Sequence, residues 1–217
     1  MTEAMPPHLR ALPLIGFGAG LRPGEILGLT VSTVEGLPPR RPGGLALVGE
    51  AGPGALVVRQ QMQTVRGAPT LRPLKGAKGK RSGEHRVPVV AELVEAVRLQ
   101  LAACGEGPGG LVFATPPGEP VSRGHLSREW RKAAQGAGVE GARPHDLRHS
   151  YATNLLREGV SVAAVSGWLG HRSVQTTLDT YWHAIPGDED RGRAVVARLL
   201  GGSGVSDVPQ DVPQTGA

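Results

Sequence analysis

The sequence is poor in cysteine and in aromatic residues, and each shortage excludes a class of protein. Its 217 residues include one cysteine, Cys104, which excludes an internal disulfide and a metal site built from several thiolates. Aromatic residues make up 3% of the chain, so leucine, valine and alanine have to build most of the core.

The sequence also lacks a long apolar run. The apolar stretch at residues 11–21 contains a proline and three glycines, and it is too short to span a membrane. It has neither the basic start nor the cleavage site that a secretory signal peptide requires. We therefore expect a cytoplasmic protein with no membrane segment.

Positive charge is in excess. The chain carries 24 lysine and arginine residues against 19 aspartate and glutamate residues, which gives a formal net charge of +5 at pH 7. This balance favours a polyanionic partner, although an acidic membrane surface would suit the charge equally well.

Glycine and proline are abundant, at 33 and 19 residues, and they cluster in the expected loops and in the last segment. This distribution indicates long connections around one compact domain over residues 1–200. Residues 201–217 are polar, contain proline and show no apolar pattern, so we expect a disordered tail there.

The apolar pattern predicts an α+β fold that is mainly α-helical and has a small antiparallel sheet. Stretches rich in β-branched residues between polar turns predict strands at 55–61, 69–72 and 85–90. Apolar residues at three- and four-residue spacing, together with start and stop signals, predict the helices. They span residues 8–19, 23–30, 91–103, 122–135, 144–159, 161–170, 173–181 and 191–200.

Residues 145–181 bring together side chains that can hold and attack a phosphate. His145 and Arg148 are three positions apart, so they share one face of a helix. His171 follows in a Gly-His loop, and Tyr181 comes ten residues later. Basic groups beside a phenol indicate phosphoryl-transfer chemistry on DNA.

The chain has two tyrosines, and their settings differ. Tyr151 falls with Leu147 and Leu155 on the apolar side of its predicted helix, so we expect it in the core. Tyr181 follows polar residues, so we expect it to face solvent or substrate and to be the nucleophile.

Several motifs resemble those of the tyrosine recombinases, the phage integrase family. In chain order they are GLRPGE at 20–25, the basic turn before RVPV at 86–89, HDLRHSYAT at 145–153, LGH at 169–171 and LDTY at 178–181. The resemblance runs from about residue 8 to residue 185 and implies the catalytic fold of DNA breaking-rejoining enzymes. It also implies site-specific recombination or integration of double-stranded DNA, typical of a mobile genetic element, by a homo-tetramer.

The resemblance assigns a role to each site residue, with no cofactor and no metal. It implies that Tyr181 attacks the scissile phosphorus, giving a 3′-phosphotyrosine link and a free 5′-hydroxyl. Arg22 and Arg148 would grip the non-bridging oxygens, because planar guanidinium groups match phosphate geometry. His145 would assist proton transfer from the phenol, and His171 would hold a phosphate oxygen.

The resemblance also implies a hairpin lysine that protonates the leaving 5′-oxygen. Lys75 fits this role best, with Lys78 and Lys80 as alternatives. Family members normally carry an N-terminal helical domain that binds the core DNA site, and we expect that this chain begins almost at the catalytic domain.

Other functions remain open at the level of the sequence. The chain could be a truncated, catalytically silent DNA-binding fragment of an integrase, or it could have type IB topoisomerase activity. A zinc hydrolase is a third alternative, because His145 and His149 are four residues apart and loosely resemble an HExxH helix.

Overall fold

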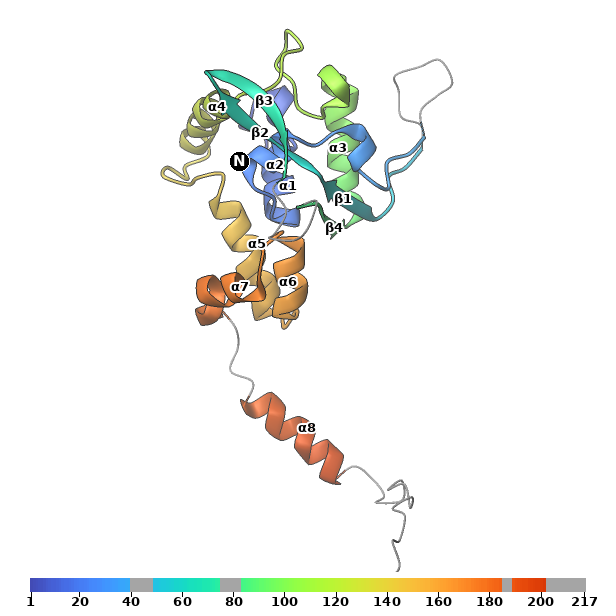
Figure 1. The fold of residues 1–217 in the computed structure, drawn as a ribbon, viewed down its shortest axis with the longest axis vertical. Coiled ribbons are helices and arrows are strands. Elements are labelled where there is room, and N and C mark those ends of the chain that lie inside the picture. The colour runs from blue at the N-terminus through green and yellow to red at the C-terminus, as the bar shows by residue number, and fades with distance from the viewer. Residues whose placement is uncertain (40–48, 75–82, 185–188, 202–217) are drawn as a thin grey trace, which may run out of the picture. The chain divides into compact units, whose positions relative to one another are not determined.

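The computed structural model describes residues 1–39, 49–74, 83–184 and 189–201. The chain divides into two compact units, Met1–Ile185 and Pro186–Ala217. None of the described helices is long and apolar enough to cross a membrane. The helices of the first unit are α1 (Leu12–Ala19), α2 (Pro23–Leu27), α3 (Ala91–Cys104), α4 (Arg123–Gly136), α5 (Asp146–Arg157), α6 (Val162–Trp168) and α7 (Val174–Tyr181) (Figure 1).

Two pairs of antiparallel strands form the predicted sheet region. They are β1 (Gly54–Val58) with β4 (His85–Val89), and β2 (Gln60–Val65) with β3 (Ala68–Pro73). Leu56 lies opposite Val87 in the first pair, and Met62 lies opposite Leu71 in the second. The strand predicted at 55–61 is therefore two strands, which separate at Arg59 and take different partners, whereas the strands predicted near 69–72 and 85–90 are confirmed.

Local signals set several helix ends. The side chain of Ser122 accepts a hydrogen bond from the His125 N–H at 3.0 Å, and it caps α4. Ser161 caps α6 in the same way through the Ala164 N–H, at 3.3 Å. Both ends agree with the helix starts predicted from the sequence.

Two predicted helices are shorter than expected. The helix predicted from residue 8 begins at Leu12, after a short 3-10 helix at Pro7–Leu9, because Pro13 has no N–H and is tolerated only in a first turn. The helix predicted over 23–30 ends at Leu27, and Thr30 instead forms a β-bridge with Leu111.

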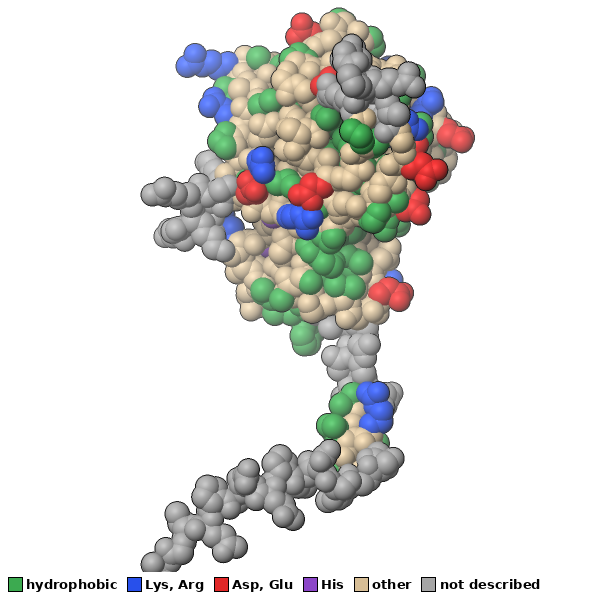
Figure 2. All heavy atoms as spheres, turned by 90° about the vertical axis from the view of Figure 1, so that its right-hand side faces the viewer, with side chains coloured by type: hydrophobic (Ala, Val, Ile, Leu, Met, Phe, Trp, Pro, Cys, Tyr) green, Lys and Arg blue, Asp and Glu red, His purple; other side chains and the backbone are tan. Residues whose placement is uncertain are grey.

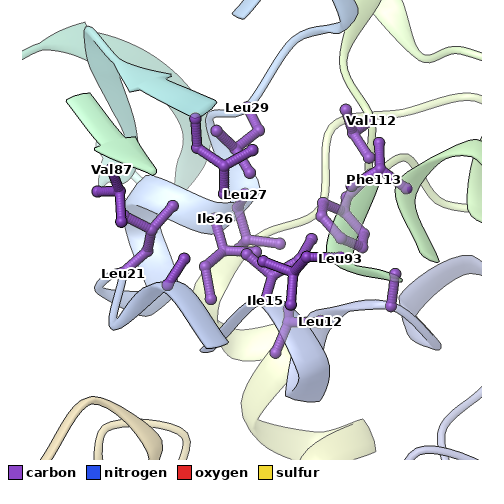
Figure 3. Packing of buried hydrophobic residues seen from close by; sticks show 14 of the residues in the cluster. Leu12, Ile15, Leu21, Ile26, Leu27, Leu29, Val87, Leu93, Val112 and Phe113 are labelled. Carbon is purple, nitrogen blue, oxygen red and sulfur yellow. The ribbon is translucent and has the colours of Figure 1, made fainter. Parts of the chain in front are cut away.

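The core lies between α1, α2, the strands and α3. Leu12 and Ile15 of α1 lie near Ile26 of α2 and Leu93 of α3, with Phe113 beside them (Figure 3). Most buried members of the core are leucine, valine and alanine, as the composition predicts. This packing fixes α1 and α2, and with them the turn that carries Arg22.

The side of the first unit that carries α3 shows acidic and basic side chains interspersed (Figure 2). On α3 itself Arg98 pairs with Glu95, and Arg86 of β4 pairs with Glu35. This face therefore lacks the uniform positive charge that a polyanion would select.

Helix α8 (Glu189–Gly201) belongs to the second unit and matches the helix predicted at 191–200. It exposes apolar side chains at Val195, Val196, Leu199 and Leu200.

Candidate active site

Arg22 is placed by the turn between α1 and α2. Helix α1 ends at Gly20, whose φ of 63° is left-handed and whose Cβ, if present, would lie 2.3 Å from the ring of Tyr151. Pro23 then starts α2, so Arg22 is the residue that caps this helix. The turn between α1 and α2 therefore fixes the position of Arg22 at the surface.

Glu25 holds Arg22 in place through two hydrogen bonds. The backbone N–H of Arg22 donates to Glu25 Oε2 at 2.8 Å, and Arg22 Nη1 donates to Glu25 Oε1 at 2.7 Å. The side chain of Arg22 is 40% exposed, whereas that of Glu25 is 2% exposed. Glu25 therefore holds the guanidinium group of Arg22 on its buried side, and the exposed side is open to a ligand.

Arg148 of α5 is buried, although arginine side chains are mostly exposed in folded proteins. Its Nη1 donates to Gly20 O at 2.9 Å and its Nη2 donates to Leu169 O at 2.7 Å. Nη1 also lies 3.9 Å from Glu25 Oε2. Burial, and then the charge of Arg22, lower the pKa of Arg148 to about 10, so it stays protonated at neutral pH.

His171 lies beside these arginines on the loop between α6 and α7. Its Nδ1 is 2.8 Å from the hydroxyl of Thr177, which is fully buried in α7. Burial lowers the pKa of His171 to about 4, and the charges of Arg148 and Arg22 act in the same direction. The ring is therefore neutral at pH 7, and it offers Nε2 to a ligand when Thr177 donates to Nδ1.

A hollow of about 410 Å³ opens above this group. Its lining includes Arg22, Gln61, His171 and Arg172. A larger, more apolar hollow of about 560 Å³ lies beside α4 and contains none of the predicted site residues. The smaller hollow is the one whose lining suits a phosphate.

Tyr181 is the last residue of α7 and is 3% exposed, so the expectation that it faces solvent is wrong for this structure. It packs with the core cluster, which the polarity of its sequence neighbours does not reveal. Burial raises the pKa of Tyr181, and the charges of Arg148 and Arg22 act in the opposite direction. Tyr151 is also buried, as predicted, and burial raises its pKa to about 12.

The hydroxyl of Tyr181 lies 3.0 Å from Nδ1 of His149 on α5. His145, at the start of α5, is exposed, and its ring meets that of His149 edge-on with centroids 4.9 Å apart. Partial burial of the ring, followed by the charges of His149 and Arg148, lowers the pKa of His145. The three rings thus form a row in which His149 is the middle member.

The structure brings the predicted residues together in two groups. Arg22, Glu25 and His171 line the small hollow, and Arg148 lies against Glu25. His145 and Tyr181 are joined through His149. Lys75, Lys78 and Lys80 lie outside the described residues.

The sequence interpretation did not include Glu25 among the site residues, and it named His149 only for the zinc alternative. A signal existed for each: Glu25 stands three residues after Arg22, the spacing of a capping box, and His149 stands one helical turn after His145. Within the described part of the chain, no group of three or more His, Cys, Asp or Glu residues is arranged to hold a metal ion.

Comparison with known proteins identifies relatives of the chain. A profile of the Phage integrase family matches residues 57–186. The tyrosine recombinase XerC-like protein of Caldanaerobacter subterraneus subsp. tengcongensis is 30% identical over 192 residues, which cover 86% of this chain and 48% of that protein. The tyrosine recombinase XerD of Corynebacterium glutamicum is 37% identical over 110 residues, which cover 48% of this chain and 36% of that protein. The chain spans about half the length of the XerC-like relative.

Solved structures share the fold. The Tn1549 transposon integrase in complex with transposon right end DNA has a TM-score of 0.67 at 19% identity, over 88% of this chain and 59% of that chain. The catalytic domain of bacteriophage HP1 integrase has a TM-score of 0.54 at 16% identity, over 90% of this chain and 86% of that chain. The predicted fold, mainly helical with a small antiparallel sheet, is confirmed. The chain belongs to the phage integrase family, the tyrosine recombinases.

Proposed function

We propose that this chain cleaves and rejoins double-stranded DNA at specific sites through a 3′-phosphotyrosine link formed by Tyr181. The observation that supports the proposal best is the pair Arg22 and Arg148, which converge on the single carboxylate of Glu25. Two guanidinium groups and one carboxylate leave one net positive charge, which matches the single negative charge of a DNA phosphate.

The arginines act on the phosphate that is being transferred. In the transition state, negative charge builds up on the non-bridging oxygens, and donors already fixed in place stabilise it without reorganisation. Arg22 is held by Glu25, and Arg148 is held by two backbone carbonyls, so both are preorganised. His171 supplies a further donor from Nε2.

The phenol of Tyr181 is the attacking group. We call residues 169–173, between α6 and α7, the phosphate-binding loop. The hydrogen bond between His171 and Thr177 ties this loop to α7, the helix that ends at Tyr181. This link connects His171 to the helix that carries the nucleophile. Lys75, or else Lys78 or Lys80, protonates the leaving 5′-oxygen.

The partner is double-stranded DNA, and we expect the protein to work as a homo-tetramer on paired duplexes in the cytoplasm. The net positive charge of the chain and the exposed guanidinium group of Arg22 support DNA as the ligand. The solved complex of the Tn1549 integrase contains transposon end DNA, which is consistent with this choice.

Covalent trapping on a nicked suicide DNA tests the proposal. The wild-type chain should form an adduct that survives denaturation, and Tyr181→Phe should form none. Tyr151→Phe is the matched control, because it removes the hydroxyl of the other tyrosine and should leave the adduct intact. DNA binding without any Tyr181-dependent adduct would instead favour a silent DNA-binding fragment. Relaxation of supercoiled plasmid without a preferred site would favour a type IB topoisomerase.

A further inference from the structure

We propose that Thr177 is a positioning residue for the reaction, which fixes the ring of His171 in the orientation and tautomer that donate a hydrogen bond from Nε2 to the phosphate. The inference rests on the proposed function and deepens it, because it gives a role to a side chain that does not itself touch DNA.

The hydroxyl group of Thr177 is buried and is used by one partner. Thr177 is 0% exposed and lies within α7. Among the residues that the structure describes, its hydroxyl has one hydrogen-bond partner, which is Nδ1 of His171 at 2.8 Å. A buried hydroxyl group whose proton has no acceptor is destabilising, so that proton has to be used in this contact. Thr177 therefore donates, and Nδ1 accepts.

This contact differs from the usual behaviour of threonine in a helix. A helical threonine commonly donates to the carbonyl group four residues earlier. Thr180 does so on the same helix, since its hydroxyl donates to Thr176 O at 2.8 Å. The corresponding carbonyl for Thr177 is Ser173 O, which instead accepts from the hydroxyl of Ser166 at 3.3 Å. The hydroxyl of Thr177 is thus available for the imidazole ring.

The direction of this hydrogen bond decides which nitrogen of His171 carries the proton. Burial lowers the pKa of His171 to about 4, so at pH 7 the ring is neutral and has one N–H. Because Nδ1 accepts from Thr177, the proton is on Nε2. Nε2 can then donate to a non-bridging phosphate oxygen. The other tautomer would present a lone pair to the phosphate and repel it.

The phosphate-binding loop fixes the backbone of His171 but not its ring. The N–H of His171 donates to Ser166 O at 3.1 Å, and Leu169 O accepts from Nη2 of Arg148 at 2.7 Å. These two bonds leave both side-chain torsions of His171 free. In the part of the chain that the structure describes, the bond to Thr177 is the one hydrogen bond that the ring makes. The hydroxyl of Thr177 therefore sets the direction of Nε2.

Nitrogen-15 NMR of the chain with labelled histidine, at pH 7, tests the tautomer directly. The resonances of His171 are the ones that His171→Asn removes. In the wild type, the tautomer with the proton on Nε2 should exceed the other by at least about tenfold. Thr177→Val keeps the shape of the side chain and removes the hydroxyl, so the two ring resonances should move toward each other. Thr177→Ser keeps the hydroxyl and should retain the wild-type spectrum.

Single-turnover cleavage of the nicked suicide DNA tests the consequence for the reaction. At saturating DNA, Thr177→Val should cleave about tenfold slower with unchanged DNA affinity, because a donor that is not fixed in place stabilises the transition state less. Thr177→Ser should cleave within about twofold of the wild-type rate, because the hydroxyl is retained. Thr180→Val is the matched control, because it removes an exposed hydroxyl from the same helix and should leave the rate unchanged. In a His171→Asn background, Thr177→Val should cause no further loss.

The outcomes separate the two proposals. If the wild-type chain forms no adduct, the proposed function fails, while the spectra still decide whether Thr177 fixes His171. A proton on Nδ1 of His171 in the wild type would overturn the inference, and so would a Thr177→Val variant with the wild-type spectrum or the wild-type cleavage rate.

Equal slowing by Thr177→Val with and without the His171 ring would mean that Thr177 only supports the packing of α7. The inference would then fail, and the function would stand. If Thr177→Val does not fold, Thr177→Ala takes its place in each comparison, because it also removes the hydroxyl.

Discussion

The guanidinium group of Arg148 and the carboxylate of Glu25 approach to 3.9 Å, and each side chain is 2% exposed. The same carboxylate accepts two hydrogen bonds from Arg22, so one buried negative charge serves both arginines. Without this carboxylate, the guanidinium groups of Arg22 and Arg148 would repel each other in the free protein. Glu25 therefore holds the two arginines together in the free protein.

Glu25→Gln should destabilise the free protein because it leaves the buried charge of Arg148 without its counter-charge. Breaking a buried pair by removing one partner costs about 3 kcal/mol, which lowers the Tm of a chain of this size by roughly 6–12 °C. Thermal unfolding followed by circular dichroism measures the change, and added sulfate should recover part of it.

Glu35→Gln is the control for this variant. Glu35 pairs with Arg86 on the surface, where ion pairs contribute little, so its Tm should match that of the wild type. Equal losses in the two variants would contradict the role given to Glu25.

Gly170→Ala should disturb the phosphate-binding loop. Gly170 has a φ of 62°, and a Cβ there would lie 2.6 Å from the ring of His85. The added methyl group should cost about 1–3 kcal/mol and move His171 away from the arginines. Covalent trapping should show slower cleavage, while Tyr181 itself is unchanged.

Gly167→Ala is the control for Gly170→Ala. Gly167 lies within α6, and a Cβ there would have no neighbour within 4 Å. Alanine is a better helix former than glycine, so this variant should be as stable as the wild type or slightly more stable. A cleavage defect in Gly167→Ala as large as that of Gly170→Ala would rule out a specific effect on the loop.

The sequence singled out residues that the structure brings close together, but it did not predict their environment. Arg22 was found because Pro23 starts a helix and a family motif surrounds it, and Tyr151 was assigned to the core from helix periodicity. Both predictions depend only on residues that are close in the sequence, so they can be made without the folded structure.

The burial of Arg148 and Tyr181 could not be predicted in this way. Arg148 is buried because the carbonyl groups of Gly20 and Leu169 accept its hydrogen bonds, and Gly20 is 128 residues away. Helix periodicity assumes that a charged side chain faces water unless it is paired, and these partners become visible only in the folded chain.

Acid should destabilise the free protein partly through His171. Its folded-state pKa of about 4 is below its ordinary value of 6.5, so the unfolded state takes up a proton first as the pH falls. The contribution of His171 to stability is therefore present above pH 6.5 and is lost between pH 6.5 and about 4. His85 and His145 act in the same direction, because burial lowers their pKa values too.

Urea unfolding at several pH values, with wild type and His171→Asn, measures this contribution. The variant should lose less stability than the wild type between pH 6.5 and 4. If the free energy of unfolding depends on pH identically in the two proteins, His171 does not contribute to the loss of stability in acid.

The proposed role of a lysine as the proton donor to the leaving oxygen can be tested by chemistry. Lys75→Ala, Lys78→Ala and Lys80→Ala should be compared on ordinary suicide DNA and on DNA with a 5′-bridging sulfur. Sulfur leaves without needing a proton, so the variant that lacks the general acid should be about 100-fold slow on the first substrate and near wild type on the second. We expect this behaviour from Lys75→Ala. Rescue of Lys78→Ala or Lys80→Ala instead would move the assignment to that residue, and three variants with wild-type rates would exclude the segment as the source of the proton.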